Sequence, residues 1–109
     1  SLKKSVDIPD DYPVDIVPLY PDALVFGVAQ QPSGYSVALF TQDEFTDVAE
    51  FYKDFYKDAT IAFMNDEVGY FDMMGSHEGY TFTIITMPES EVEGYITSIN
   101  LISVVGEMP

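Results

Sequence analysis

Residues 39–58 are the one stretch of this chain with the hydrophobic pattern of an amphipathic helix. Its apolar side chains recur at intervals of three and four residues, so a helix places them on a single stripe. The residues of this stripe are Phe45, Val48, Ala49, Tyr52, Phe55 and Tyr56. A single amphipathic helix beside several strands must bury its stripe on a sheet, and we therefore expect the stripe to be core.

The start of the helix is predicted from Thr41 and Glu44, which have the spacing of a capping box. In that motif the amide of Glu44 donates to the threonine hydroxyl, and the glutamate accepts from the amide of Thr41. We therefore expect the helix to begin directly after Thr41.

The segments outside this stretch are short runs rich in apolar and β-branched residues, separated by turns that contain glycine or proline. Six strands are expected, at residues 23–30, 35–41, 60–65, 70–74, 80–87 and 95–105. The predicted fold class is α+β. It is a single domain in which one amphipathic helix packs on a mainly antiparallel sheet, in the order ββαββββ.

The second face of the sheet is the open question of this fold. One helix covers only part of a sheet, and neither face of the strands at 80–87 and 95–105 is cleanly polar. We expect either the N-terminal segment or another chain to cover that second face. Self-association through the sheet face or an edge strand is therefore one of the predicted contacts.

Residues 1–22 contain four prolines interleaved with aspartates. Repeated proline is incompatible with a helix and weakens the pairing of strands, so we expect an extended segment. We divide the chain into a Pro- and Asp-rich lead-in or tether at residues 1–14 and a single domain at residues 15–109. Within the domain, Ile16, Val17, Leu19 and Tyr20 are expected to lie against its surface.

The charge of the chain argues against several functions. It carries nineteen acidic residues against four lysines or arginines, for a net charge of −15. A field of this sign repels the phosphates of nucleic acids and the surface of anionic membranes. The sequence contains no glycine-rich phosphate-binding loop, no cysteine and no apolar run long enough to span a bilayer. We expect no nucleic-acid partner, no membrane insertion of this domain and no cofactor.

Residues 15–23, Asp-Ile-Val-Pro-Leu-Tyr-Pro-Asp-Ala, resemble the opening motif D-x-P-[L/I]-Y-P-G-A of small bacterial extracytoplasmic domains. In these domains a strand hairpin follows, then a helix with a Phe-Tyr pair, here Phe51-Tyr52, and then further strands. Asp22 departs from the motif by replacing the glycine, and Val17 adds a residue before the proline. The resemblance implies a lipoprotein-type domain of the cell envelope without an assigned activity. Its signal or anchor is expected to precede Ser1.

His77 is the only histidine and lies in a glycine-flanked turn at residues 75–79. A catalytic interpretation makes His77 a general base beside Glu78, with Ser76 as nucleophile. Three residues of one turn rarely reach the geometry of a triad, in which a partner orients the base through its other nitrogen. We therefore interpret this turn as a solvated hairpin tip.

Asn65, Asp66 and Glu67 form a second polar turn and are the candidate ligands of a cation. Calcium takes six to eight oxygen ligands at set spacings, and the loop lacks that pattern. The alternative function is a small hydrolase or a calcium-dependent site built from the acidic turn residues. That alternative requires a pocket that joins the turns at 65–69 and 75–79.

The eight tyrosines are the most informative aromatic feature of the sequence. Tyrosine favours strands and the rims of small cores, and it is also enriched at interfaces. As a contact patch, the candidate binding residues are Tyr70 and Tyr80, which fall on neighbouring predicted strands. The preferred hypothesis is a non-enzymatic extracytoplasmic binding or structural module of unknown ligand, which contacts a protein partner or a second copy.

Overall fold

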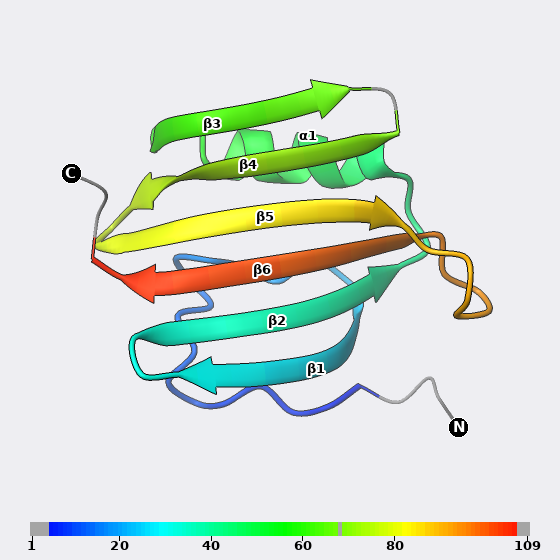
Figure 1. Ribbon diagram of the computed structural model, residues 1–109, viewed down its shortest axis with the longest axis horizontal. Helices are drawn as coiled ribbons and strands as arrows, with labels where there is room; N and C mark the ends of the chain where they lie inside the picture. The colour runs from blue at the N-terminus through cyan, green and yellow to red at the C-terminus, as the bar shows by residue number, and fades with distance from the viewer. Residues whose placement is uncertain (1–4, 68, 107–109) are drawn as a thin grey trace.

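The computed structural model describes residues 5–67 and 69–106. Its elements, in chain order, are β1 (Leu24–Gln31), β2 (Gly34–Thr41), α1 (Phe45–Phe55), β3 (Thr60–Glu67), β4 (Tyr70–His77), β5 (Tyr80–Pro88) and β6 (Thr97–Val105). The strands form one antiparallel sheet in the spatial order β1-β2-β6-β5-β4-β3 (Figure 1). The predicted α+β class and the order ββαββββ are confirmed.

The last strand, β6, lies in the middle of the sheet, between β2 and β5 (Figure 1). It pairs with β2 from Gly34↔Val104 to Thr41↔Thr97, across a long separation in sequence. The other pairs join strands that are neighbours in sequence through short connections. The hairpin β1–β2 and the meander β3–β4–β5 are therefore joined into one sheet by β6 alone.

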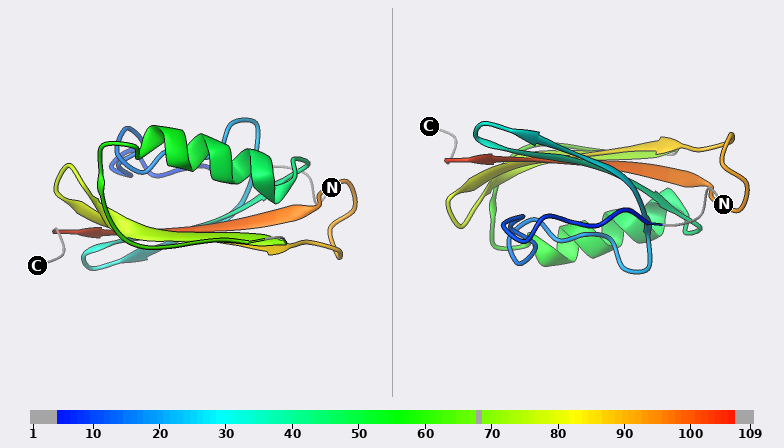
Figure 2. Two further views of the ribbon diagram at one scale, coloured as in Figure 1. Left: turned by 90° about the horizontal axis from the view of Figure 1, so that it is seen from above. Right: turned by 90° about the horizontal axis from the view of Figure 1, so that it is seen from below.

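The helix and the N-terminal segment both lie on the same face of the sheet (Figure 2). The segment 5–23 runs beside α1 rather than over the opposite face. Of the two expected coverings of the second face, the N-terminal segment is therefore excluded, and coverage by another chain stays a prediction. The result is a slab of 41 × 32 × 17 Å with one covered face and one open face.

The predicted helical stripe forms the centre of the core. Val48, Ala49, Tyr52 and Tyr56 are buried against the sheet, as their spacing predicts. The ring of Tyr56 stacks on that of Phe82 in β5, with 3.8 Å between the ring centroids. This stack joins the last turn of the helix to the middle of the sheet.

The predicted capping box does not form. The helix begins at Phe45, and Glu44 is its N-cap without a side-chain hydrogen bond. Thr41 is instead the last residue of β2 and pairs with Thr97, so the sheet holds it away from the helix. Its hydroxyl accepts from the amide of Asp43 at 3.1 Å. Strand pairing has thus overridden a local capping preference.

Hydroxyl groups of tyrosines hold the N-terminal segment on the helix. Tyr52 Oη donates to the carbonyl of Pro18 at 2.8 Å, and Tyr56 Oη donates to that of Ile16 at 2.7 Å. From within the segment, Tyr12 Oη donates to the carbonyl of Val17 at 2.7 Å. Proline removes backbone donors, so these carbonyls find their partners among side chains rather than in a ladder.

The packing of the segment begins before residue 15. Tyr12 is buried in the core, together with Val17 and Tyr20. The amide of Val6 donates to the carbonyl of Val25 at 3.0 Å, which places the start of the described chain along the edge strand β1. The division between a lead-in at 1–14 and a domain at 15–109 stays a prediction.

Candidate functional site

The predicted cation ligands point to different sides of the sheet. Asn65 and Glu67 pair with Asp72 and Tyr70, whereas Asp66 pairs with the buried Phe71. Because successive side chains of a strand alternate between faces, Asp66 lies on the helix side and the other two lie on the open side. Asp66 Oδ2 is 2.5 Å from Lys53 Nζ of the helix. Among the described residues, no group of three His, Cys, Asp or Glu side chains is arranged to hold a metal ion.

His77 is the last residue of β4 rather than part of a solvated tip. Its ring packs edge-on against Phe55 and Tyr56, with centroid distances of 5.8 and 5.5 Å. The turn itself is Glu78-Gly79, and both residues have positive φ. The strand expected at residues 70–74 ends before Gly75, which places His77 in the predicted turn, whereas β4 continues through Gly75 to His77.

The two polar turns lie at opposite ends of β4. Glu67 pairs with Tyr70 at the first residue of that strand, and His77 pairs with Tyr80 at its last. Seven residue steps at about 3.3 Å separate the ends by roughly 23 Å. This arrangement does not form the shared pocket that a hydrolase or calcium site of Asp66, Glu67, His77 and Glu78 requires.

The structure does not bring Tyr70 and Tyr80 together. Tyr70 lies on the open side of the sheet, at the end near the β3–β4 turn, and is 40% exposed. Tyr80 is half-buried on the helix side at the other end, where it pairs with His77. The two tyrosines therefore belong to separate surfaces, and neither alone makes a patch.

Five of the other tyrosines have structural surroundings that raise the pKa of the phenol. Burial raises the pKa of Tyr12, Tyr52 and Tyr56 well above the usual phenol value. Burial and then the hydrogen bond to Asp43 raise the pKa of Tyr20. The hydrogen bond that Tyr35 donates to Asp11 is the main cause that raises the pKa of Tyr35 to about 12. Every cause favours the neutral phenol, so these residues serve as hydrogen-bond donors.

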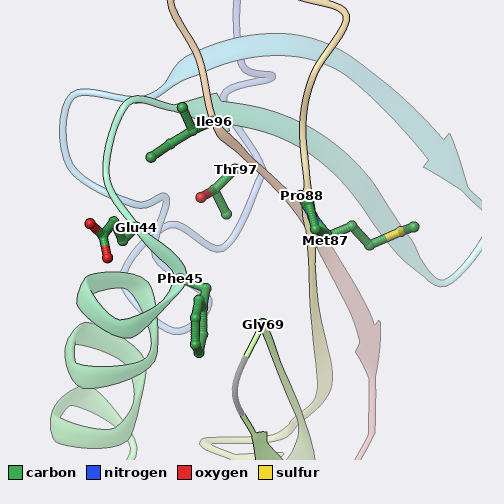
Figure 3. A pocket seen from close by; sticks show the side chains of 7 residues that line it. All are labelled: Glu44, Phe45, Gly69, Met87, Pro88, Ile96 and Thr97. Carbon is green, nitrogen blue, oxygen red and sulfur yellow. The ribbon is translucent and has the colours of Figure 1, made fainter.

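A small hollow lies where the helix begins. Its volume is about 220 Å³, below the range of about 300–1,000 Å³ that is usual for ligand pockets. Figure 3 shows Phe45, Ile96 and Thr97 around it, close to Gly69, while the carboxylate of Glu44 points away from Phe45. No acid and base converge here, so the hollow offers shape without the groups for general acid–base chemistry.

The largest feature without a partner is the open face of the sheet, which faces the viewer in Figure 1. We define the open face as the side chains of β2 to β6 that point away from α1. They are the even-numbered residues of β2, β4 and β6, the odd-numbered residues of β5, and Phe63, Asn65 and Glu67 of β3. No other part of the described chain covers this face (Figure 2).

The open face carries few charges and combines apolar side chains with hydroxyl and amide groups. Met74, Ile85 and Ile102 lie on β4, β5 and β6 and are half-buried by neighbouring side chains of the sheet. Phe63 is 54% exposed and Met87 is 55% exposed. Exposed apolar side chains that gather on one surface indicate a contact site, whereas scattered ones do not.

More than half of the nineteen acidic side chains belong to the other layer. Residues 5–23 contain five of them and residues 42–59 contain six. Among the described residues, the charged side chains of the open face are Glu67 and Asp72. The molecule is therefore two-sided, with an acidic helix layer and a nearly neutral sheet face.

Asp72 is the unusual polar residue of this face. It lies between Asn65 of β3 and Ile85 of β5 and borders a shallow hollow of about 240 Å³ that Phe63 and Met74 also line. Its Oδ1 is buried and has no hydrogen-bond partner in the structure. A buried acceptor without a donor costs about 1–3 kcal/mol, so this oxygen is suited to accept from a partner.

Sequence reasoning did not single out Asp72 or Phe63. The alternation of apolar residues did signal that the second face is not polar, yet it could not say which face the N-terminal segment covers.

The comparisons with family models, curated proteins and solved structures find no match for this chain. Within the described residues, no helix is long and apolar enough to cross a membrane.

Proposed function

We propose that this chain is a non-enzymatic binding or structural module that works outside the cytoplasm, and that the open face is its contact surface. The observation that supports it is the uncovered sheet face itself. That face carries exposed apolar side chains and almost no charge on a molecule whose net charge is −15. Solvent-exposed sheet faces of antiparallel folds are commonly polar, so exposed apolar side chains such as Phe63 and Met87 on such a face favour a partner.

The resemblance of residues 15–23 to the opening of bacterial extracytoplasmic domains supports the proposed location. In the structure this segment is held by the helix through Tyr52 and Tyr56, as an opening motif with a structural role would be. We propose that the domain belongs to a cell-envelope protein of the lipoprotein type.

Site-specific photo-crosslinking in cells that produce the native protein tests this function. A photoreactive residue at Met87 lies on the open face, and one at Glu50 lies on the exposed side of the helix. We expect discrete crosslinked products from position 87 and none from position 50. Equal products from both positions, or none from position 87, would contradict the proposed contact surface.

A further inference from the structure

We propose that the occupant of the open face is a second copy of this chain. Two domains would pack sheet against sheet, with their helices on the two outer surfaces. This inference rests on the proposed function, because it identifies the partner of the same surface. Four observations support it: the area of the face, the distribution of charge, the unpartnered oxygen of Asp72 and the self-matching chemistry of the face.

The area of the face fits a stable pair. The open face spans five strands of eight or nine residues, β2 to β6. Strands lie about 4.8 Å apart and rise about 3.3 Å per residue, so the face covers roughly 670 Å². Stable protein interfaces bury about 600–1,000 Å² per partner, and two sheets stack readily with their strands nearly aligned.

The distribution of charge favours a second copy over a basic partner. In a face-to-face pair the acidic layers at residues 5–23 and 42–59 lie on the two outer surfaces, far apart and in water. Met74, Ile85 and Ile102 would leave water at the same time. A basic partner would instead be attracted to the acidic layer, since the open face offers it only two carboxylates.

The buried Oδ1 of Asp72 lacks a hydrogen-bond donor, and an uncharged donor is sufficient. The open face carries uncharged donors, among them Thr83 and Asn100, on strands β5 and β6. In a two-fold pair each surface meets its own equivalent, so a donor of one copy that reaches Asp72 of the other makes the same contact twice. The same surface thus carries both apolar side chains and uncharged donors of the kind that the buried oxygen lacks.

Net charge gives this pair a distinctive dependence on salt. Two chains of charge −15 repel each other over long distances, and salt screens that repulsion. A pair of identical chains must therefore tighten as salt rises. A complex with a basic partner must weaken under the same change.

Sedimentation equilibrium of the 109-residue chain tests the proposal. At micromolar concentrations and about 0.15 M salt we expect a mass of twice the 12.2 kDa of one chain. The dissociation constant should rise at least about threefold when the ionic strength is lowered to about 0.01 M. A monomer at every salt concentration overturns the inference.

Thr83→Lys places a charge at the centre of the open face, and Thr46→Lys makes the same change on the exposed side of the helix. Both variants reduce the net negative charge equally, so only the position differs. We expect Thr83→Lys to be monomeric and Thr46→Lys to remain dimeric. Asn100→Lys repeats the test on β6 in case Thr83→Lys fails to fold, as circular dichroism will show.

Asp72→Asn distinguishes a second copy of the chain from a basic partner. It removes one negative charge per copy and keeps a side chain that can accept, so a pair of identical chains should bind equally well or more tightly.

A dimer that survives both Thr83→Lys and Asn100→Lys forms elsewhere and overturns the inference. A monomer that still crosslinks to another protein from Met87 would overturn the inference and leave the proposed contact surface standing.

Discussion

Asp22 adopts a backbone conformation that favours glycine. The amide of Ala23 donates to the carbonyl of Tyr20 at 3.3 Å, which closes a four-residue turn around Pro21 and Asp22. Asp22 has φ of 60°, in the left-handed region. With proline at its second position, such a turn favours glycine at its third. Asp22 stands where the motif that residues 15–23 resemble has glycine.

We predict that Asp22→Gly stabilises the domain by about 0.5 kcal/mol, because glycine adopts positive φ without steric cost. Urea unfolding followed by circular dichroism measures this change. Asp22→Ala is the control, since it removes the same charge and keeps the Cβ. If Asp22→Ala stabilises as much as Asp22→Gly, charge rather than backbone conformation explains the gain.

At the scale of elements, local sequence patterns predicted those features that do not depend on residues far away in the chain. The stripe from Phe45 to Tyr56 was predictable because apolar residues spaced by three and four positions lie on one side of a helix. The cap at Thr41 was not, because its pairing with Thr97 comes from the other end of the chain. The same reason applies to the tyrosine hydroxyls, which reach carbonyls 34 and 40 residues away.

The sequence could predict that a second, non-polar sheet face exists, but not which residues lie together on it. Alternation in β5 and β6 indicated a second face that is not polar. A proline-rich segment has no period, so the sequence could not show that residues 5–23 lie beside the helix. The position of Asp72 between Asn65 and Ile85 depends on the register of three strands, which a bulge between Ile61 and Phe63 shifts.

Gly75 is required by the close approach of β3 and β4. A Cβ at this position would lie 2.3 Å from the carbonyl oxygen of Thr60 and 3.1 Å from Cζ of Phe82. We predict that Gly75→Ala destabilises the domain by about 1–3 kcal/mol, because the backbone of β3 must shift. Chemical denaturation measures this loss.

Gly27→Ala is the matched control for Gly75→Ala. It makes the same change in β1, where a Cβ would meet nothing within 4 Å. We expect this variant to be neutral or slightly stabilising, since alanine restricts the unfolded chain. Equal losses at both positions would contradict the role of close packing.

At the scale of the whole molecule, the buried tyrosines determine how the domain responds to alkali. Five phenols have pKa values raised in the folded state, Tyr35 to about 12 and the others further. The unfolded chain ionises its tyrosines near about pH 10. Between these values the folded state holds more protons, so stability is present below pH 10 and falls as pH rises.

We therefore predict that the free energy of unfolding decreases steadily above about pH 10. Phenolate absorbance and circular dichroism, recorded together during an alkaline titration, measure ionisation and unfolding. The two should change in one cooperative step. Stability that stays constant up to pH 12 would contradict the structural role of these tyrosines, and Tyr35→Phe should make the decrease shallower.

The central position of β6 also has a consequence for when the chain can fold. Synthesis proceeds from the N-terminus, so β1–β2 and β3–β4–β5 are made first, and each has an edge that only β6 joins. The nascent chain lacks a complete sheet until residues 97–105 have left the ribosome. Long-range pairing of this kind forms late and slowly. Until β6 emerges, the edges of β2 and β5 that it will join stay available for other pairing.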